Sequence, residues 1–305
     1  MINIPFIKYT KVWIVISALT VITCIILFVT LGLKLGIDFT GGSLMELTFS
    51  KNVPNIEQMQ KVLGDLHQKN AVVQKLGDNG YIIRTEFLNE DQHQFILSNL
   101  RAEFESSDNQ IHEENFQTIG SAISTQLRER AIWAIVLVNL GIIIYVAYAF
   151  RGVSRPVASW KYGFLVIVAL IHDIMLVVGI FALLGHFKGV EVDIGFVVAL
   201  LTVLGYSVTD TIVVYDRIRE NLTHHSAQNF AEMVNMGLNQ TLMRSLNTTF
   251  ITLLPLFALY FLGGSTVHNF ALALIIGIAS GAYSSVFIAS PLLVLAQNWH
   301  FGKKA

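Results

Sequence analysis

The sequence predicts a polytopic α-helical membrane protein with six transmembrane helices and one α+β domain inserted between the first two. Of its 305 residues, 53% are hydrophobic and only 13% are charged, about half the charged share of an average soluble domain. Charge is also distributed unevenly, because residues 34–130 hold 14 of the 21 acidic side chains and 9 of the 20 basic ones. This composition excludes an ordinary soluble enzyme and a strongly basic nucleic-acid-binding protein.

Six apolar stretches are long enough to cross a bilayer, which takes roughly 20 residues of helix. The expected spans are Val12–Leu33, Ala131–Phe150, Tyr162–Gly185, Ile194–Tyr215, Leu246–Leu262 and Phe270–Gln297. Pro291 predicts a bend within the sixth span. No A-x-A-like cleavage site follows the first span, so we expect an uncleaved anchor. The expected domains are 1–33 with the first span, 34–130 as the α+β domain, and 131–305 with the remaining five spans.

Basic residues in the short connections predict the orientation, because such loops stay in the cytoplasm. One side of the membrane collects Lys8, Lys11, Arg151, Arg155, Lys161, Arg217, Arg219, Arg244, Lys303 and Lys304. The opposite short loops hold Lys188 as their basic residue, beside Glu191 and Asp193. We therefore expect both termini in the cytoplasm and residues 34–130 on the other side of the membrane.

Residues 34–130 follow the order β-α-β-β-α-β, the ferredoxin-like arrangement. The pattern predicts strands at Ser43–Phe49, Ala71–Leu76, Tyr81–Phe87 and Gln110–Ile119, with helices over about 54–69 and 90–106. Gly41 and Gly42 are expected to form a tight turn before the first strand. The domain has no HExxH motif, nucleophile elbow or phosphate loop, which favours a binding or lever role over catalysis. His67, His93 and His112 are expected on the solvated surface.

Charged residues at membrane depth are the candidate functional groups, because burying one at a helix centre costs about 2.5–3.5 kcal/mol even on insertion scales. The candidates are Asp173 in the third span, Asp210 in the fourth and Arg244 at the start of the fifth. Helical spacing aligns further residues with them. Asp210 shares a stripe with Thr202, Tyr206, Thr209, Val213 and Arg217, and Arg244 shares one with Thr248, Thr252 and Pro255. Two polar stripes of opposite sign would face each other if these helices pack together.

A carboxyl group in a helix bundle can take up a proton from one side and release it to the other. Desolvation favours its neutral form, whereas a nearby guanidinium favours its charged form. Proton handling is therefore one interpretation of Asp210 with Arg244, supported by Thr209, Thr248 and Thr252, and a static ion pair is the other. Both interpretations stay open for Asp173 as a second candidate.

Small residues in the sixth span predict helix packing. Gly277 and Gly281 form a G-x-x-x-G motif, extended by Ser280, Ser284 and Ser285, which allows two helix backbones to approach closely. The single cysteine, Cys24, lies in an apolar run, so neither an intrachain disulfide nor a cysteine-based metal site is possible. We expect no metal and no other cofactor.

Four segments together resemble the SecD/SecF family of protein-export membrane proteins, within the resistance-nodulation-division superfamily. They are GIDFTGGS after the first span, IHDIMLVVG in the third, VTDTIVVYDRIREN in the fourth and QTLMRSLNTT before the fifth. The resemblance runs through the whole chain in order. By this resemblance, the acid of the family's D-T-I-V motif falls on Asp210 and its basic partner on Arg244.

The resemblance implies a SecF-type subunit in the bacterial inner membrane, with residues 34–130 in the periplasm. Such a subunit works with SecD beside the SecYEG channel, with YajC as a further candidate partner, and couples the proton-motive force to preprotein export. The periplasmic domain would contact the preprotein or SecD.

Three alternatives remain at the level of sequence. One is a passive scaffold that stabilises SecD, and another is a proton-driven transporter of a different substrate class. The third is an intramembrane aspartyl protease, suggested by acids on two spans. It is disfavoured because the chain lacks a G-x-G-D element, and because Arg244 would oppose the neutral carboxyl that such chemistry requires.

Overall fold

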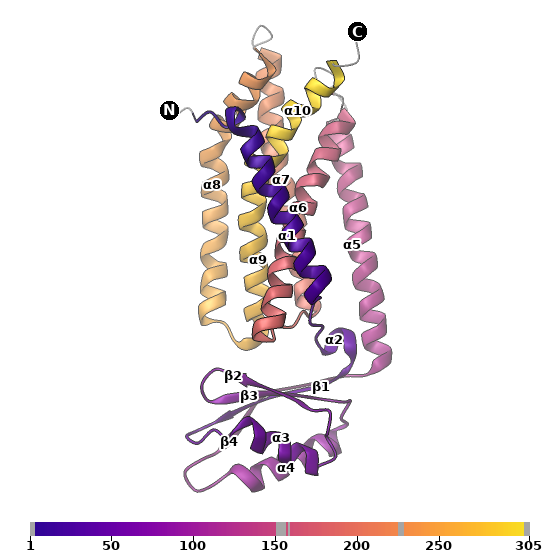
Figure 1. The fold of residues 1–305 in the computed structure, drawn as a ribbon, viewed down its shortest axis with the longest axis vertical. Helices are drawn as coiled ribbons and strands as arrows, with labels where there is room; N and C mark the ends of the chain where they lie inside the picture. The colour runs from indigo at the N-terminus through magenta and orange to yellow at the C-terminus, as the bar shows by residue number, and fades with distance from the viewer. Residues whose placement is uncertain (1–3, 151–156, 158, 225–228, 302–305) are drawn as a thin grey trace. The chain divides into compact units, whose positions relative to one another are not determined.

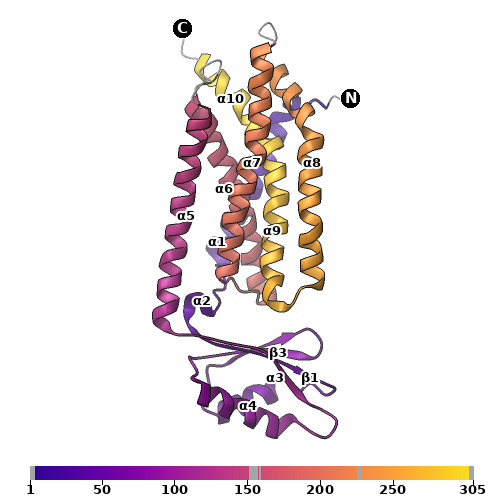
Figure 2. The same ribbon diagram turned by 180° about the vertical axis from the view of Figure 1, so that it is seen from behind.

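A computed structural model describes residues 4–150, 157, 159–224 and 229–301. Its chain divides into two compact units, a helical unit of Met1–Lys34 with Trp133–Ala305 and an α+β unit of Leu35–Ile132. Six helices are long and apolar enough to cross a membrane, and a small four-stranded sheet lies between the first and second of them in sequence (Figures 1 and 2). The predicted fold class is confirmed. Arg151, Arg155, Lys303 and Lys304, used above to predict orientation, lie outside the described residues.

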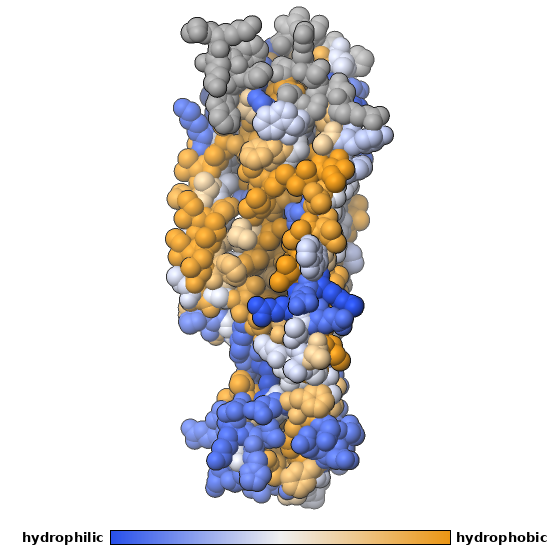
Figure 3. Space-filling model, turned by 90° about the vertical axis from the view of Figure 1, so that its right-hand side faces the viewer, coloured by the Kyte–Doolittle hydropathy of each residue, from blue (hydrophilic) through white to orange (hydrophobic). Residues whose placement is uncertain are grey.

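The helical unit consists of long helices with short connections. They are α1 (Thr10–Leu31), α5 (Ser121–Ala149), α6 (Ser159–Lys188), α7 (Ile194–His224), α8 (Phe230–Leu262), α9 (Ser265–Ser284) and α10 (Ser290–Phe301), with a 3-10 turn at Ile7–Tyr9 before α1. Helices α6, α7 and α9 form the buried centre, whereas only 11% of the most apolar window of each of α1, α5 and α8 is buried. On the face drawn in Figure 3, apolar side chains cover most of the helical surface, as a membrane-spanning unit requires.

Helix α5 begins at Ser121 rather than at Ala131, and two further helices have amphipathic extensions beyond the predicted spans. Helix α7 continues past Tyr215 to His224, and α8 begins at Phe230 rather than at Leu246. The apolar-length criterion missed these extensions because they are amphipathic rather than uniformly apolar. The side chain of Asn229 caps α8 by accepting a hydrogen bond from the Ala231 amide at 3.2 Å.

The sixth span bends where Pro291 predicts. A π-helical turn, Ser285–Ala289, separates α9 from α10. Two side chains of α7 form hydrogen bonds with this turn, one at each of its ends. The Tyr215 hydroxyl donates to the Ala289 carbonyl at 2.9 Å, and the Thr211 and Ser285 hydroxyls are 2.8 Å apart.

The glycines of the G-x-x-x-G motif lie where α9 meets α7. A Cβ atom placed on Gly277 would lie 2.2 Å from Val203 Cγ2, and one on Gly281 would lie 2.9 Å from Ser207 Cβ. Both distances are shorter than ordinary carbon contacts of 3.5–4.0 Å. The two helices therefore approach each other as closely as the absence of these side chains allows.

The α+β unit contains a short helix α2 (Ile37–Thr40), then β1 (Gly42–Phe49), α3 (Ile56–Asp65), β2 (Val72–Leu76), β3 (Gly80–Thr85), α4 (Glu90–Phe104) and β4 (Ile111–Ile119). The sheet order is β2-β3-β1-β4 with antiparallel neighbours, and α3 and α4 cover one face (Figure 1). Alternate residues of β1, Met45, Leu47 and Phe49, are buried in the core against these helices. The predicted ferredoxin-like order is confirmed.

The glycine pair lies where α2 ends and β1 begins. Gly41 and Gly42 have φ values of +75° and +119°, which side-chain-bearing residues rarely adopt. A Cβ on Gly42 would also lie 2.6 Å from the carbonyl oxygen of Thr85 on β3. The pair is therefore needed both for its conformation and for the close approach of two strands.

His93 does not lie on the solvated surface, so that prediction was wrong. It is 4% exposed, its Nε2 lies 2.6 Å from Glu113 Oε1, and its ring stacks on Phe116 with centroids 3.6 Å apart. The helical spacing of His93 with the buried residues Ile96, Leu97 and Leu100 was the overlooked signal.

Candidate functional site

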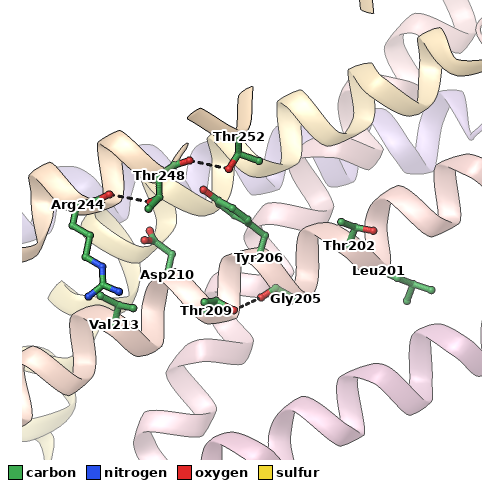
Figure 4. Close-up of a pocket in the computed structure, with 10 residues that line it drawn as sticks. All are labelled: Leu201, Thr202, Gly205, Tyr206, Thr209, Asp210, Val213, Arg244, Thr248 and Thr252. Carbon is green, nitrogen blue, oxygen red and sulfur yellow. Dashed lines mark hydrogen bonds between the residues drawn. The ribbon is translucent and has the colours of Figure 1, made fainter. Parts of the chain in front are cut away.

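A groove with a volume of about 560 Å³ lies between α7 and α8 (Figure 4). Its lining from α7 is Leu201, Thr202, Gly205, Tyr206, Thr209, Asp210 and Val213, and its lining from α8 is Arg244, Thr248 and Thr252. The two polar stripes expected from helical spacing thus line one groove. The predicted polar residues of these stripes line the groove, with Asp210 and Arg244 among them, except Arg217, whose guanidinium bonds Gln240 and Glu220 instead.

Asp210 is hydrogen-bonded to a hydroxyl of the neighbouring helix α8. The Ser245 Oγ donates to Asp210 Oδ2 at 2.7 Å, and both residues are buried at 9% exposure or less. Ser245 was missed at the level of sequence. It belongs to a row of buried hydroxyl residues on α8, Thr241, Ser245 and Thr249, whose four-residue spacing places them on one helical face.

Arg244 shares the groove without forming a direct ion pair with Asp210. Figure 4 shows its guanidinium directed toward Val213, whereas the Asp210 carboxyl points toward α8. Both residues are among those that the structure describes, and no guanidinium nitrogen of Arg244 lies within 4.0 Å of a carboxylate oxygen of Asp210. The guanidinium and the carboxyl nevertheless line the same groove. The geometry therefore differs from a static, closed ion pair.

The threonines of the groove use their hydroxyl protons within their own helices. Thr209 Oγ1 donates to the Gly205 carbonyl at 2.9 Å, Thr248 Oγ1 to the Arg244 carbonyl at 2.9 Å, and Thr252 Oγ1 to the Thr248 carbonyl at 2.8 Å. Because a hydroxyl also carries acceptor lone pairs, each of these oxygens can accept a hydrogen bond from water in the groove.

Asp173 lies at a separate position between α6, α7 and α9. It is fully buried and accepts hydrogen bonds of 2.6–2.7 Å from the hydroxyls of Ser207, Ser280 and Ser284. His172 Nδ1 lies 3.1 Å from its Oδ1. Sequence reasoning assigned Ser280 and Ser284 to helix packing alone and did not predict that they bind this carboxyl.

The two membrane aspartates have different surroundings. The hydrogen bonds described for Asp173 and Asp210 go to different partners and do not join the two residues. An aspartyl protease needs two carboxyl groups that share a proton, so this arrangement gives no support to that alternative. Among the described residues, no group of three His, Cys, Asp or Glu side chains is placed to hold a metal ion.

Comparison with known proteins identifies the family. A model described as protein export membrane protein SecD/SecF, C-terminal, matches residues 99–299, well over half of the chain. The chain belongs to the SecD/SecF family. A second SecD/SecF model, the GG motif, matches residues 26–53, which include the Gly41–Gly42 pair.

Relatives in the SecD/SecF family match nearly the whole chain. The protein translocase subunit SecF of Thermobaculum terrenum is 42% identical, with 98% of this chain and 95% of that one covered. The SecF of Anaerolinea thermophila is 36% identical, with 93% and 91% covered. The crystal structure of SecDF, a translocon-associated membrane protein from Thermus thermophilus, is 34% identical with a TM-score of 0.82. This chain is covered over 97% of its length and spans 39% of that SecDF chain.

Proposed function

We propose that this chain is a SecF-type subunit of the Sec protein translocation machinery, which couples the proton-motive force to preprotein export. In this proposal Asp210 is the protonatable group and Arg244 neutralises it when it is ionised. Thr209, Thr248 and Thr252 order water along the groove. The SecF relatives, which match this chain over almost their full length, support the assignment to translocation.

The arrangement around Asp210 supports the proton role. The carboxyl accepts a hydrogen bond from Ser245, and it borders a groove that could admit water. A cation lies in the same groove but is not locked to it. A change in the distance between Arg244 and Asp210 would change how strongly the carboxyl holds its proton.

Asp173 is the second candidate for proton handling. It lies within hydrogen-bonding distance of His172, which lines a groove of about 380 Å³ between α1, α6 and α9. Its hydrogen bonds to serines of α7 and α9 also make it a packing group, so its substitution tests both roles.

The proposed setting is the bacterial inner membrane, with both termini in the cytoplasm and the α+β unit in the periplasm. SecD is the proposed partner of the helical unit, beside the SecYEG channel and YajC. The α+β unit would contact the preprotein or SecD. Basic residues at the helix starts support this orientation, because Lys8 lies just before α1, Lys11 at its beginning and Lys161 at the beginning of α6.

The test combines export, assembly and proton flux. In cells that depend on this chain, Asp210→Asn and Arg244→Met are expected to leave the complex with SecD intact while export falls to the level without the subunit. Asp216→Asn is the matched control, because Asp216 lies on the same helix and pairs at the surface with Arg219. Proteoliposomes with the purified complex should lose proton flux in the first two variants only.

The outcomes separate the candidate functions. Normal export with Asp210→Asn in an assembled complex would refute the proton role and leave the passive scaffold. Loss of assembly in the same variant would indicate a structural role. Proton flux that persists without any effect on preprotein export would indicate a transporter of another substrate class.

A further inference from the structure

The start of α8 carries three amide side chains, Asn235, Asn239 and Gln240, in the part of the helix that precedes the predicted span. All three bond to segments outside α8. Two face the N-terminal segment of the chain, and the third faces α7.

Asn239 binds the backbone of Ile4 through both ends of its amide. Its Oδ1 accepts from the Ile4 amide at 2.8 Å, and its Nδ2 donates to the Ile4 carbonyl at 2.9 Å. One turn earlier, Asn235 Oδ1 accepts from the Ile7 amide at 3.3 Å. These hydrogen bonds go to the main chain only. They do not involve the side chain at position 4, which is 37% exposed.

The N-terminal segment is itself fixed to the helical unit. Phe6 is 4% exposed, and its ring packs edge-on against Phe287 of the π-helical turn, with centroids 5.7 Å apart. Trp13 Nε1 donates to the Phe6 carbonyl at 3.2 Å. Asn235 and Asn239 therefore bind a segment whose position is fixed by its own packing against the helical unit.

Gln240 joins α8 to α7 on the other side. Its Oε1 accepts from Arg217 Nε at 2.7 Å and from Asn221 Nδ2 at 2.9 Å. Close packing reinforces this contact, because a Cβ on Gly237 would lie 2.8 Å from Ile218 Cγ1. The beginning of α8 is thus held from two directions.

We propose that Asn235, Asn239 and Gln240 form a clamp that positions Ser245 and Arg244 against Asp210. Ser245 lies five positions after Gln240 in the helix, about 7.5 Å along the axis, so a shift at the clamp reaches the groove. Beyond the clamp the outward side of α8 is exposed at Met243, Leu246 and Phe250. The clamp residues are positioning residues, and their link to transport rests on the proposed function of Asp210.

Disulfide cross-linking in the full chain tests the clamp. In a Cys24→Ala background, Asp210→Cys combined with Ser245→Cys places two thiols where the native side chains are hydrogen-bonded. Such a pair cross-links only when the Cβ atoms lie within about 4.5 Å. A second pair, Thr211→Cys with Ser285→Cys, reports on α7 and the π-helical turn without involving α8.

Three further substitutions distinguish backbone recognition from general loosening. Asn239→Ala removes both hydrogen bonds to Ile4, and Ile4→Pro removes the amide donor from the other side. Ile4→Ala keeps both backbone groups and is the matched control.

Asn239→Ala and Ile4→Pro should each slow cross-linking of the 210–245 pair about tenfold, the scale expected for the loss of one or two neutral hydrogen bonds. Ile4→Ala should leave this rate unchanged, and no variant should affect the 211–285 pair. The proposal is overturned if the 210–245 pair fails to cross-link in the Cys24→Ala chain that keeps Ile4 and Asn239. It is also overturned if Asn239→Ala leaves the cross-linking rate unchanged, or if Ile4→Ala slows it as much as Ile4→Pro does. Because the reporter pair replaces Asp210, the result is independent of whether Asp210→Asn abolishes export.

Discussion

Gly277→Ala is expected to force α7 and α9 apart. The new Cβ would lie 2.2 Å from Val203 Cγ2, 2.8 Å from Cγ1 and 3.0 Å from Cβ, so the helices must separate by roughly 1 Å to restore an ordinary carbon contact. Overpacking of this kind costs about 1–3 kcal/mol. Alanine stabilises a helix by about 1 kcal/mol relative to glycine. The net destabilisation of the folded state by Gly277→Ala is therefore about 0–2 kcal/mol.

Gly141→Ala on α5 is the matched control for this substitution. Apart from the adjacent backbone of α5 itself, nothing lies within 4 Å of a Cβ at Gly141, so this variant gains the helical preference of alanine without a clash. The free energy of unfolding of the two variants should therefore differ by about 1–3 kcal/mol. Reversible unfolding of the purified chain in mixed detergent micelles, followed by circular dichroism, measures the difference.

Val203→Ala should rescue Gly277→Ala. It removes both Cγ atoms that the new Cβ would meet, at the cost of a cavity in the wild-type contact. The double-mutant cycle should give a favourable coupling of about 1 kcal/mol or more. Equal stability of Gly277→Ala and Gly141→Ala, or a coupling near zero, would refute the close α7–α9 contact.

Three further expectations follow from buried polar contacts. Asp173→Leu should destabilise the helical unit by about 3 kcal/mol or more, because it leaves buried serine hydroxyls without their acceptor. Asp173→Asn should lower the free energy of unfolding by a smaller amount in the same assay. Asn109→Ala should destabilise the α+β unit by about 2–4 kcal/mol, since the Asn109 amide takes part in four hydrogen bonds with backbone groups. Hydrogen exchange of that unit measures the effect, and protection equal to wild type would contradict it. His93→Ala should cost about 1–3 kcal/mol, whereas His112→Ala, at an exposed position, should stay within about 0.5 kcal/mol.

Periodicity predicted most of the polar residues of α7 and α8 that share a groove, although it also placed Arg217 on the same stripe. Thr202, Tyr206, Thr209 and Asp210 lie at helical spacing, so any regular helix places them on one face. The same holds for the β-α-β-β-α-β order, where turn residues and alternation mark the boundaries of each element. These features are local, and the backbone geometry determines them before any tertiary contact forms.

Partners across helices could not be predicted in this way. Asp210 bonds Ser245 rather than Arg244, because the rotation of α8 about its axis decides which of two adjacent side chains faces α7. Asp173 is bound by serines that come from two other helices, and their spacing in the sequence carries no information about that carboxyl. The burial of His93 was missed for a different reason. Its helical spacing with buried residues indicated the core, but the prediction gave more weight to its polar side chain.

The sequence by itself determined the membrane class, the spans, the α+β insertion and the family, because apolar length, periodicity and motif order are properties of the chain alone. Only the tertiary structure decided that Arg244 shares the groove without closing onto Asp210, that serines surround Asp173, and that amides hold the start of α8. Each of these depends on the axial rotation and offset of packed helices. Those quantities are set by side-chain volume at the contacts, such as Gly277 against Val203, and not by the pattern of any one helix.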